Sequence, residues 1–121
     1  ILTKEELQAR SKQLGIEVYK LCKRLDKGLD TNVFGHQLLR SASSVGANYR
    51  AACRARSSKE FIAKLSICIE ECDEVMFWLE FLDSIGSYGN VNDIRDEANQ
   101  LLSIFIASRK TVANSVKNQK S

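Results

Sequence analysis

The apolar residues of this chain recur at alternating intervals of four and three residues in four separate segments. Such spacing places them along one side of an α-helix that packs in a bundle. No segment alternates between apolar and polar residues for long, as a half-buried strand would. The third segment shows the helical pattern without interruption, at Phe61, Leu65, Cys68, Cys72, Val75, Leu79 and Leu82.

The pattern predicts helices at roughly 4–26, 32–55, 58–85 and 92–117 of a single domain. Because the links between these helices are short, successive helices should run antiparallel. The predicted fold is therefore all-α, an antiparallel up-down-up-down four-helix bundle. Local signals mark its boundaries: capping boxes at Thr3 with Glu6 and at Ser57 with Glu60, an N-cap at Asn92, and turns at Asp26, Gly28 and Asp30 and at Gly86, Gly89 and Asn90.

The middle of the second segment, SASSVGA, consists almost entirely of small residues. Gly46 weakens a helix by about 1 kcal/mol relative to alanine, which predicts that a neighbouring helix approaches closely there. Asn48 occupies a position of the helical stripe where an apolar residue is expected. It either fixes the register of the helices or contacts a ligand or partner. The third and fourth segments carry additional apolar stripes, which predict that copies of the chain associate.

Composition adds an uneven charge distribution to this picture. The 121 residues include no proline and carry a formal net charge of +3. Residues 36–64 hold six basic side chains and one acidic, whereas residues 65–98 hold one basic and nine acidic. Such segregation predicts separate positive and negative surfaces that the small net charge conceals.

The basic stretch GANYRAACRARSSKEFIAKL, residues 46–65, spans the predicted corner between the second and third helices. Phosphate groups of RNA or DNA could pair with its cations. Tyr49 lies beside Arg50, but aromatic residues do not alternate regularly with the cations, so base-specific contacts are not expected. Alternatively, cations near a helix C-terminus stabilise the helix dipole, and the corner belongs to a protein-interaction scaffold. The candidate nucleic-acid-binding residues are Arg50, Arg54, Arg56, Lys59 and Lys64.

The sequence offers little for metal or covalent chemistry. Its four cysteines form no CxxC pair, and the single histidine, His36, belongs to no Glu-x-x-His motif. No glycine-rich phosphate loop occurs either. We therefore expect buried, reduced thiols, no metal or other cofactor, and no enzymatic activity. With no apolar run long enough to span a bilayer, we expect no membrane partner and a cytoplasmic protein.

The central part of the chain, residues 36–82, contains a distinctive set of residues: Gln37, Arg40, Ser41, Ala42, Ser44, Val45, the run Gly46 to Arg50 with Asn48 and Tyr49, Arg54, Phe61, Glu71, Glu74, Trp78, Leu79 and Glu80. Through this set it resembles the bacterial four-helix-bundle proteins that are encoded in 23S rRNA intervening sequences. One departure is Ala51, where family members frequently have glutamate. Two further expectations concern motif residues: Arg40 should lie level with Glu71 and Glu74, and Trp78 should lie in the core or in a subunit interface.

The resemblance implies a four-helix protomer that assembles as a homopentamer. The chain is also similar to the accessory variability determinant of diversity-generating retroelements, a basic pentamer that engages nucleic acid and a reverse transcriptase. The partners that the resemblance implies are therefore further copies of the chain, RNA or DNA, and a partner protein.

Overall fold

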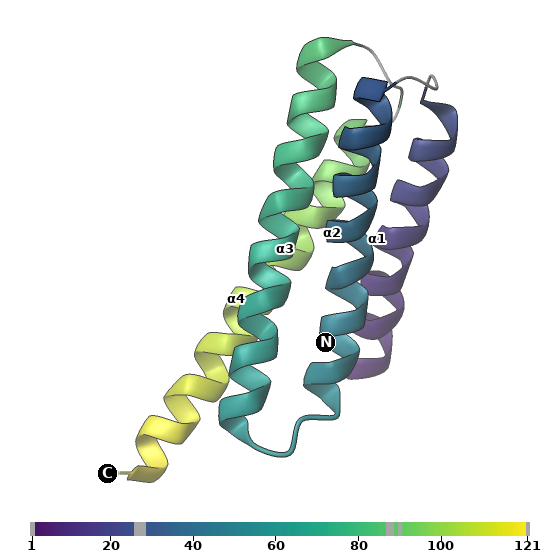
Figure 1. Ribbon diagram of the computed structural model, residues 1–121. Helices are drawn as coiled ribbons and strands as arrows, with labels where there is room; N and C mark the ends of the chain where they lie inside the picture. The colour runs from purple at the N-terminus through teal and green to yellow at the C-terminus, as the bar shows by residue number, and fades with distance from the viewer. Residues whose placement is uncertain (1, 26–28, 87–88, 90, 121) are drawn as a thin grey trace.

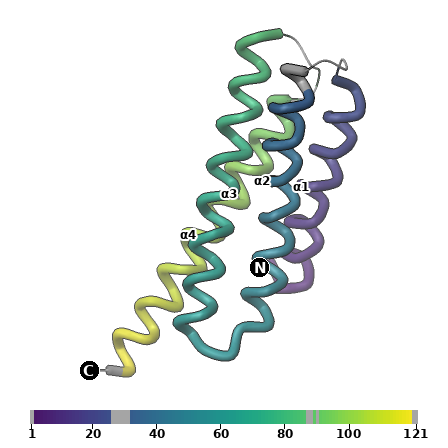
Figure 2. The backbone as a smooth tube through the Cα atoms, viewed as in Figure 1, coloured from purple at the N-terminus to yellow at the C-terminus, as the bar shows by residue number. Residues whose placement is uncertain are grey.

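A computed structural model describes residues 2–25, 29–86, 89 and 91–120, and it shows four helices packed as a bundle (Figure 1). They are α1 (Lys4–Arg24), α2 (Leu29–Cys53), α3 (Ser58–Ile85) and α4 (Val91–Lys120). The backbone tube shows that consecutive helices run in opposite directions (Figure 2). No strand occurs in the described ranges, and the predicted all-α four-helix bundle is confirmed.

The two predicted capping boxes differ in the structure. At the start of α1, the Thr3 hydroxyl accepts the Glu6 N–H at 3.1 Å, and the Glu6 carboxylate accepts the Thr3 N–H at 3.3 Å. At the start of α3, the Ser57 hydroxyl accepts the Glu60 N–H at 3.1 Å, but the Glu60 carboxylate accepts the N–H of Arg56, at 3.4 Å. The first box is confirmed, and the second is replaced by a serine cap with a displaced carboxylate.

Two boundary predictions were wrong. The backbone of Asp30 is helical because α2 begins at Leu29, and an aspartate is as compatible with the first turn of a helix as with a turn; Asp26 and Gly28 lie outside the described residues. Asn92 lies inside α4 because the helix begins one residue earlier, at Val91. The Val91 side chain is only 1% exposed, so packing in the core draws this residue into the helix.

The core is built from the predicted stripe positions. On α3, the positions from Leu65 to Leu82 that carry the pattern are completely buried. Two serines take apolar places in the stripe without leaving their hydroxyls unpaired. The Ser11 hydroxyl donates to the Leu7 carbonyl at 2.7 Å, and the Ser41 hydroxyl donates to the Leu38 carbonyl at 3.0 Å. Both side chains can therefore be buried at small cost.

The helices do not contact one another equally. Each pair of consecutive helices packs along its length, whereas α1 and α4 make the smallest contact. That contact includes the Arg10 guanidinium, which donates to the Glu97 carboxylate from Nε at 2.9 Å and from Nη2 at 2.5 Å. Beyond it, the last turns of α4 lead away from α1 (Figure 1). In the described ranges, no helix combines the length and the hydropathy needed to cross a membrane.

Candidate nucleic-acid interface

The predicted basic stretch forms the corner between α2 and α3. Helix α2 ends at Cys53, and the N–H groups of Arg54 and Ala55 donate to the carbonyls of Ala51 and Ala52 at 3.1 and 3.0 Å. These bonds tighten the last turn before the chain reverses. Ser57 then caps α3. The reversal brings cations from the end of one helix and the start of the next to the same end of the bundle.

The five candidate cations surround this corner. Arg50 and Arg54 are exposed and line a groove between α1 and α2. Arg56 and Lys59 are exposed at the corner itself. Lys64 is only half-exposed. Glu71 lies on the side of α3 that faces α2, because it bonds to Arg40 of α2. Lys64 precedes Glu71 by seven residues, or about two helical turns, and therefore lies on the same side of α3. At this end of the bundle, the cations therefore lie along the groove between α1 and α2, at the corner itself and on the side of α3 that faces α2.

The side chains of these five cations form no ion pair within the described ranges. Other cations of the chain do: Arg10 pairs with Glu97, Lys20 with Glu17, and Arg40 with two carboxylates. The acid nearest in sequence, Glu60, accepts a backbone N–H instead. The basic side chains at the corner are thus left without a direct ion pair in the described part of the protein.

The groove between α1 and α2 has a volume of about 800 Å³. Its floor is largely backbone, because the two helices meet at small residues. A Cβ atom at Gly46 would lie 3.2 Å from the Lys12 Cα and from the Ser11 carbonyl oxygen, and one at Gly15 would lie 3.4 Å from the Ser43 Cα. The close approach predicted at Gly46 is therefore present, and its partner is α1.

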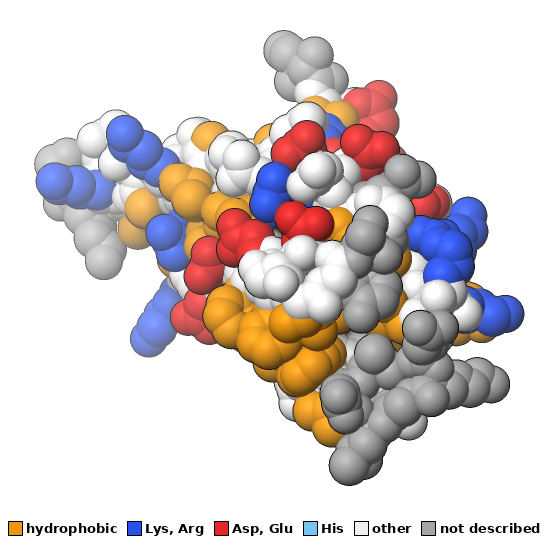
Figure 3. All heavy atoms as spheres, turned by 90° about the horizontal axis from the view of Figure 1, so that it is seen from above, with side chains coloured by type: hydrophobic (Ala, Val, Ile, Leu, Met, Phe, Trp, Pro, Cys, Tyr) orange, Lys and Arg blue, Asp and Glu red, His pale blue; other side chains and the backbone are white. Residues whose placement is uncertain are grey.

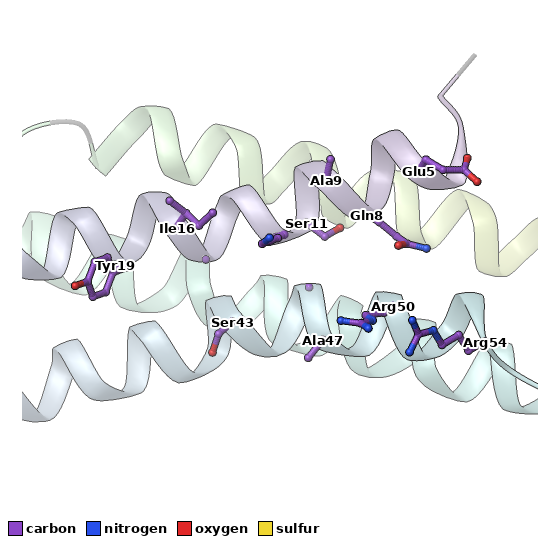
Figure 4. A pocket seen from close by; sticks show the side chains of 13 residues that line it. Glu5, Gln8, Ala9, Ser11, Ile16, Tyr19, Ser43, Ala47, Arg50 and Arg54 are labelled. Carbon is purple, nitrogen blue, oxygen red and sulfur yellow. The ribbon is translucent and has the colours of Figure 1, made fainter.

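The groove contains a cation that the sequence prediction missed, Lys12. Its backbone lies level with Gly46 of α2, one helical turn before Arg50, and Arg54 follows one turn further on at the end of the groove (Figure 4). The sequence signal that could have indicated this groove is the pair of helical glycines, Gly15 and Gly46, because a glycine within a helix often marks a close approach of another helix. The sequence alone does not show that the helix of Gly15 is the one that approaches Gly46.

Five of the residues that carry the family resemblance form one connected network between α2 and α3. The Arg40 guanidinium donates to Glu71 at 3.1 Å, to Glu74 and to Gln37, the last at 3.4 Å. The indole N–H of Trp78 donates to the Glu74 carboxylate at 3.2 Å. Hydrogen bonding to Glu74 is the main cause that raises the pKa of Arg40. The predicted alignment of Arg40 with both glutamates is confirmed.

Trp78 also belongs to an aromatic patch on α2 and α3, whose members are Val33, Phe34, Phe77, Trp78 and Phe81. Phe34 stacks on Trp78 with ring centroids 5.8 Å apart, and Phe77 meets Trp78 edge-on at 5.0 Å. Phe77 and Val33 remain 53% and 51% exposed. Apolar side chains gather at this end of the molecule, beside acidic ones (Figure 3). The patch lies at the opposite end of α2 and α3 from the basic corner.

The other two motif residues, Asn48 and Tyr49, lie apart from that network. The Asn48 amide donates to the carbonyl and the hydroxyl of Ser44, both at 2.9 Å and both within α2. The described partners of Asn48 thus belong to its own helix, and the two roles expected for it, fixing the register or contacting a ligand or partner, stay predictions. Tyr49 is buried against Phe105, and burial is the main cause that raises its pKa.

The cysteines give no sign of a metal centre. Cys68 and Cys72 are completely buried, and burial raises the pKa of the Cys68 thiol to about 12. The Cys72 pKa is raised for the same reason. Among the described residues, no group of three or more His, Cys, Asp or Glu side chains is arranged to hold a metal ion.

Comparisons with known proteins agree with the described geometry. The family model described as 23S rRNA-intervening sequence protein matches residues 4–107. A solved structure from Bacteroides thetaiotaomicron VPI-5482, described as a protein of unknown function from the S23 ribosomal protein family, is 28% identical. The match covers 88% of this chain and 97% of that one, with a TM-score of 0.80. A comparison with curated proteins finds no significant match.

Proposed function

The chain belongs to the 23S rRNA-intervening sequence protein family, and from that premise we propose that it is a non-enzymatic, homo-oligomeric protein that binds the backbone of RNA or DNA. The proposed binding surface is the basic corner, formed by Arg50, Arg54, Arg56, Lys59 and Lys64. Phosphate oxygens would supply the partners that the described carboxylates do not.

The observation that carries this proposal is the lack of ion pairs at the corner. Helix-dipole stabilisation accounts for one or two cations near the end of α2. It does not account for five cations around a single reversal, four of them exposed, when Arg10 and Arg40 elsewhere find carboxylates. A surface of this kind attracts a polyanion and releases its counterions on binding.

The expected contact is with the sugar–phosphate backbone. The basic stretch contains two aromatic residues, Tyr49 and Phe61. Tyr49 is 4% exposed and packs on Phe105, and Phe61 is partly buried against the core, so neither ring stands free at the surface for a base. Arginine and lysine side chains alone fix a nucleic acid by its phosphates and carry little sequence information. Affinity at the corner should therefore depend weakly on sequence.

The proposed assembly uses the aromatic patch. Its half-exposed Phe77 forms a contiguous apolar surface with Phe81 and Phe34. Val33, which precedes Phe34 in α2, is also half-exposed. Apolar surfaces of this kind are commonly buried between subunits. A further copy of the chain seated there leaves the basic corner free, and repetition of the corner around an assembly, such as a homopentamer, multiplies the positive surface. Nucleic-acid binding and self-association would then use different ends of the protomer.

The aromatic patch also supports the alternative function, a protein-interaction scaffold without nucleic-acid binding. In that case a partner protein covers the patch and the basic corner only stabilises the end of α2. The two functions differ in one measurable property, the salt-dependent affinity for polynucleotides.

The deciding experiment is a salt titration of binding to RNA and to DNA with the variant Arg50→Ala/Arg54→Ala/Arg56→Ala. We expect weaker binding to both, and a salt slope reduced by about 0.9 for each duplex phosphate that the variant no longer neutralises. A matched control, Lys20→Ala/Arg24→Ala/Arg95→Ala, removes the same charge from the other end of the bundle and should change affinity less. Equal binding by the parent and the corner variant would support the scaffold instead.

A further inference from the structure

We propose that the groove between α1 and α2 binds a single strand of polynucleotide, with its phosphates along Lys12, Arg50 and Arg54 and a base on the ring of Tyr19. This inference rests on the proposed function and narrows it from nucleic acid in general to unpaired strands. It also adds two binding residues, Lys12 and Tyr19, that lie outside the basic stretch.

The shape of the groove suits a chain rather than a compact ligand. It extends from Glu5 to Tyr19 along α1, which corresponds to about 21 Å at 1.5 Å per residue. Packed helix axes lie about 8–10 Å apart, and here backbone meets backbone at Gly46. A groove between such helices can receive one sugar–phosphate backbone, whereas a duplex would rest on its rims.

The cations in the groove form a row rather than a cluster. Gly46 lies level with Lys12, and Arg50 and Arg54 follow at successive turns of α2, so neighbouring cations are about 6 Å apart along the groove. None of the three pairs with a described carboxylate. Glu5 is the acid among the lining residues, so the lining keeps an excess of positive charge. A linear row of this kind matches a linear polyanion.

Tyr19 supplies a different kind of contact at the far end of the groove. Figure 4 shows its ring on α1, well separated from Arg50 and Arg54 at the other end. The side chain is 50% exposed, in contrast to the buried Tyr49. The Lys23 ammonium lies 5.6 Å from its ring centroid. A positively charged groove that ends on an accessible aromatic ring is typical of proteins that bind single strands, because an unpaired base can stack on the ring.

The experiment measures fluorescence anisotropy of labelled single-stranded RNA, single-stranded DNA and a blunt duplex at low salt. We expect tighter binding to the single strands than to the duplex. Tyr19→Leu should weaken single-strand binding by about five-fold or more and leave the affinity for inorganic polyphosphate, which has no bases, unchanged. Tyr19→Phe, which keeps the ring, should retain the affinity.

Lys12→Ala tests the row of cations independently. We expect the salt slope for single strands to fall by about 0.7, the value for one phosphate fewer neutralised. Matched controls are Lys20→Ala, an exposed lysine of α1 outside the groove lining, and Phe77→Leu, an aromatic ring of similar exposure on α3, also outside the groove lining. Both should bind as the parent does.

The two levels of proposal fail in different ways. If Tyr19→Leu and Lys12→Ala bind single strands like the parent while the triple arginine variant is weakened, the groove inference is wrong and backbone binding at the corner stands. Equal affinity for duplex and single strands overturns the groove inference in the same way. If the parent binds no polynucleotide at low salt, both fail.

Discussion

The thiols of Cys68 and Cys72 show how burial controls the chemistry of a single residue. Both side chains are completely inaccessible, and the Cys68 thiol is directed to the Val45 carbonyl, with a sulfur–oxygen distance of 3.7 Å. Because burial raises both pKa values, the neutral thiol persists at pH values where a free cysteine begins to ionise. The thiolate is the reactive form, so access and ionisation both suppress reaction.

We therefore expect Cys68 and Cys72 to react with an aromatic disulfide reagent at pH 8 only as fast as the protein opens. Cys22 and Cys53, which are partly exposed, should react earlier. Time-resolved absorbance with and without denaturant measures the two classes. The variant Cys22→Ser/Cys53→Ser should keep only the slow class, and rapid reaction of this variant in the folded state would contradict the described burial. Stoichiometric zinc in the purified protein would contradict the interpretation of these thiols as metal-free and reduced.

At the scale of the helices, the contact between α1 and α2 depends on two glycines in different surroundings. A Cβ at Gly15 meets its nearest backbone atom at 3.4 Å, an ordinary contact, whereas one at Gly46 meets Lys12 and Ser11 at 3.2 Å. We expect Gly15→Ala to stabilise the protein by up to about 1 kcal/mol through helix propensity. Gly46→Ala should gain less, because α1 must shift.

The larger substitution Gly46→Leu should destabilise the bundle by about 1–3 kcal/mol through overpacking. Thermal unfolding followed by circular dichroism should give the highest melting temperature for Gly15→Ala, a lower one for the parent and the lowest for Gly46→Leu. The melting temperature of Gly46→Ala should be below that of Gly15→Ala. An equal gain from both alanine variants would show that α1 yields freely at Gly46. The backbone floor of the groove would then be less rigid than the contacts indicate.

The packing of the helices shows what the sequence could and could not predict. The alignment of Arg40 with Glu71 and Glu74 was predictable, because residues 54–57 are a short corner that fixes the register of α2 against α3. The register of α1 against α2 was not obtained, because the predicted bounds of that link, 26 and 32, differ by two and three residues from the observed Arg24 and Leu29. Neither the groove nor Lys12 was therefore found from the pattern. The apolar stripe gave the faces of the helices correctly. It could not show that Asn48 bonds within α2 or that core packing draws Val91 into α4.

At the scale of the whole molecule, the segregated charges and apolar residues define two ends with different properties. The reversal from α2 to α3 carries unpaired cations, whereas the opposite end of the same two helices carries the aromatic patch beside acidic side chains (Figure 3). Because the ends are separated by the length of the bundle, occupation of one does not block the other. A protomer can therefore present its basic corner while another copy covers the patch.

This arrangement predicts that the protein is not a monomer at micromolar concentration. Light scattering should give a particle mass that is a multiple of the 13.6 kDa protomer. Val33→Glu/Phe77→Glu places two carboxylates in the half-exposed apolar surface, where burial of an unpaired charge is strongly unfavourable. The particle mass should then fall toward that of the protomer, while helix content is retained.

Asn99→Glu, which adds a carboxylate at an exposed position of α4, is the control and should leave the mass unchanged. A parent mass near 13.6 kDa would rule out self-association, and an unchanged mass in the double variant would place the subunit interface elsewhere.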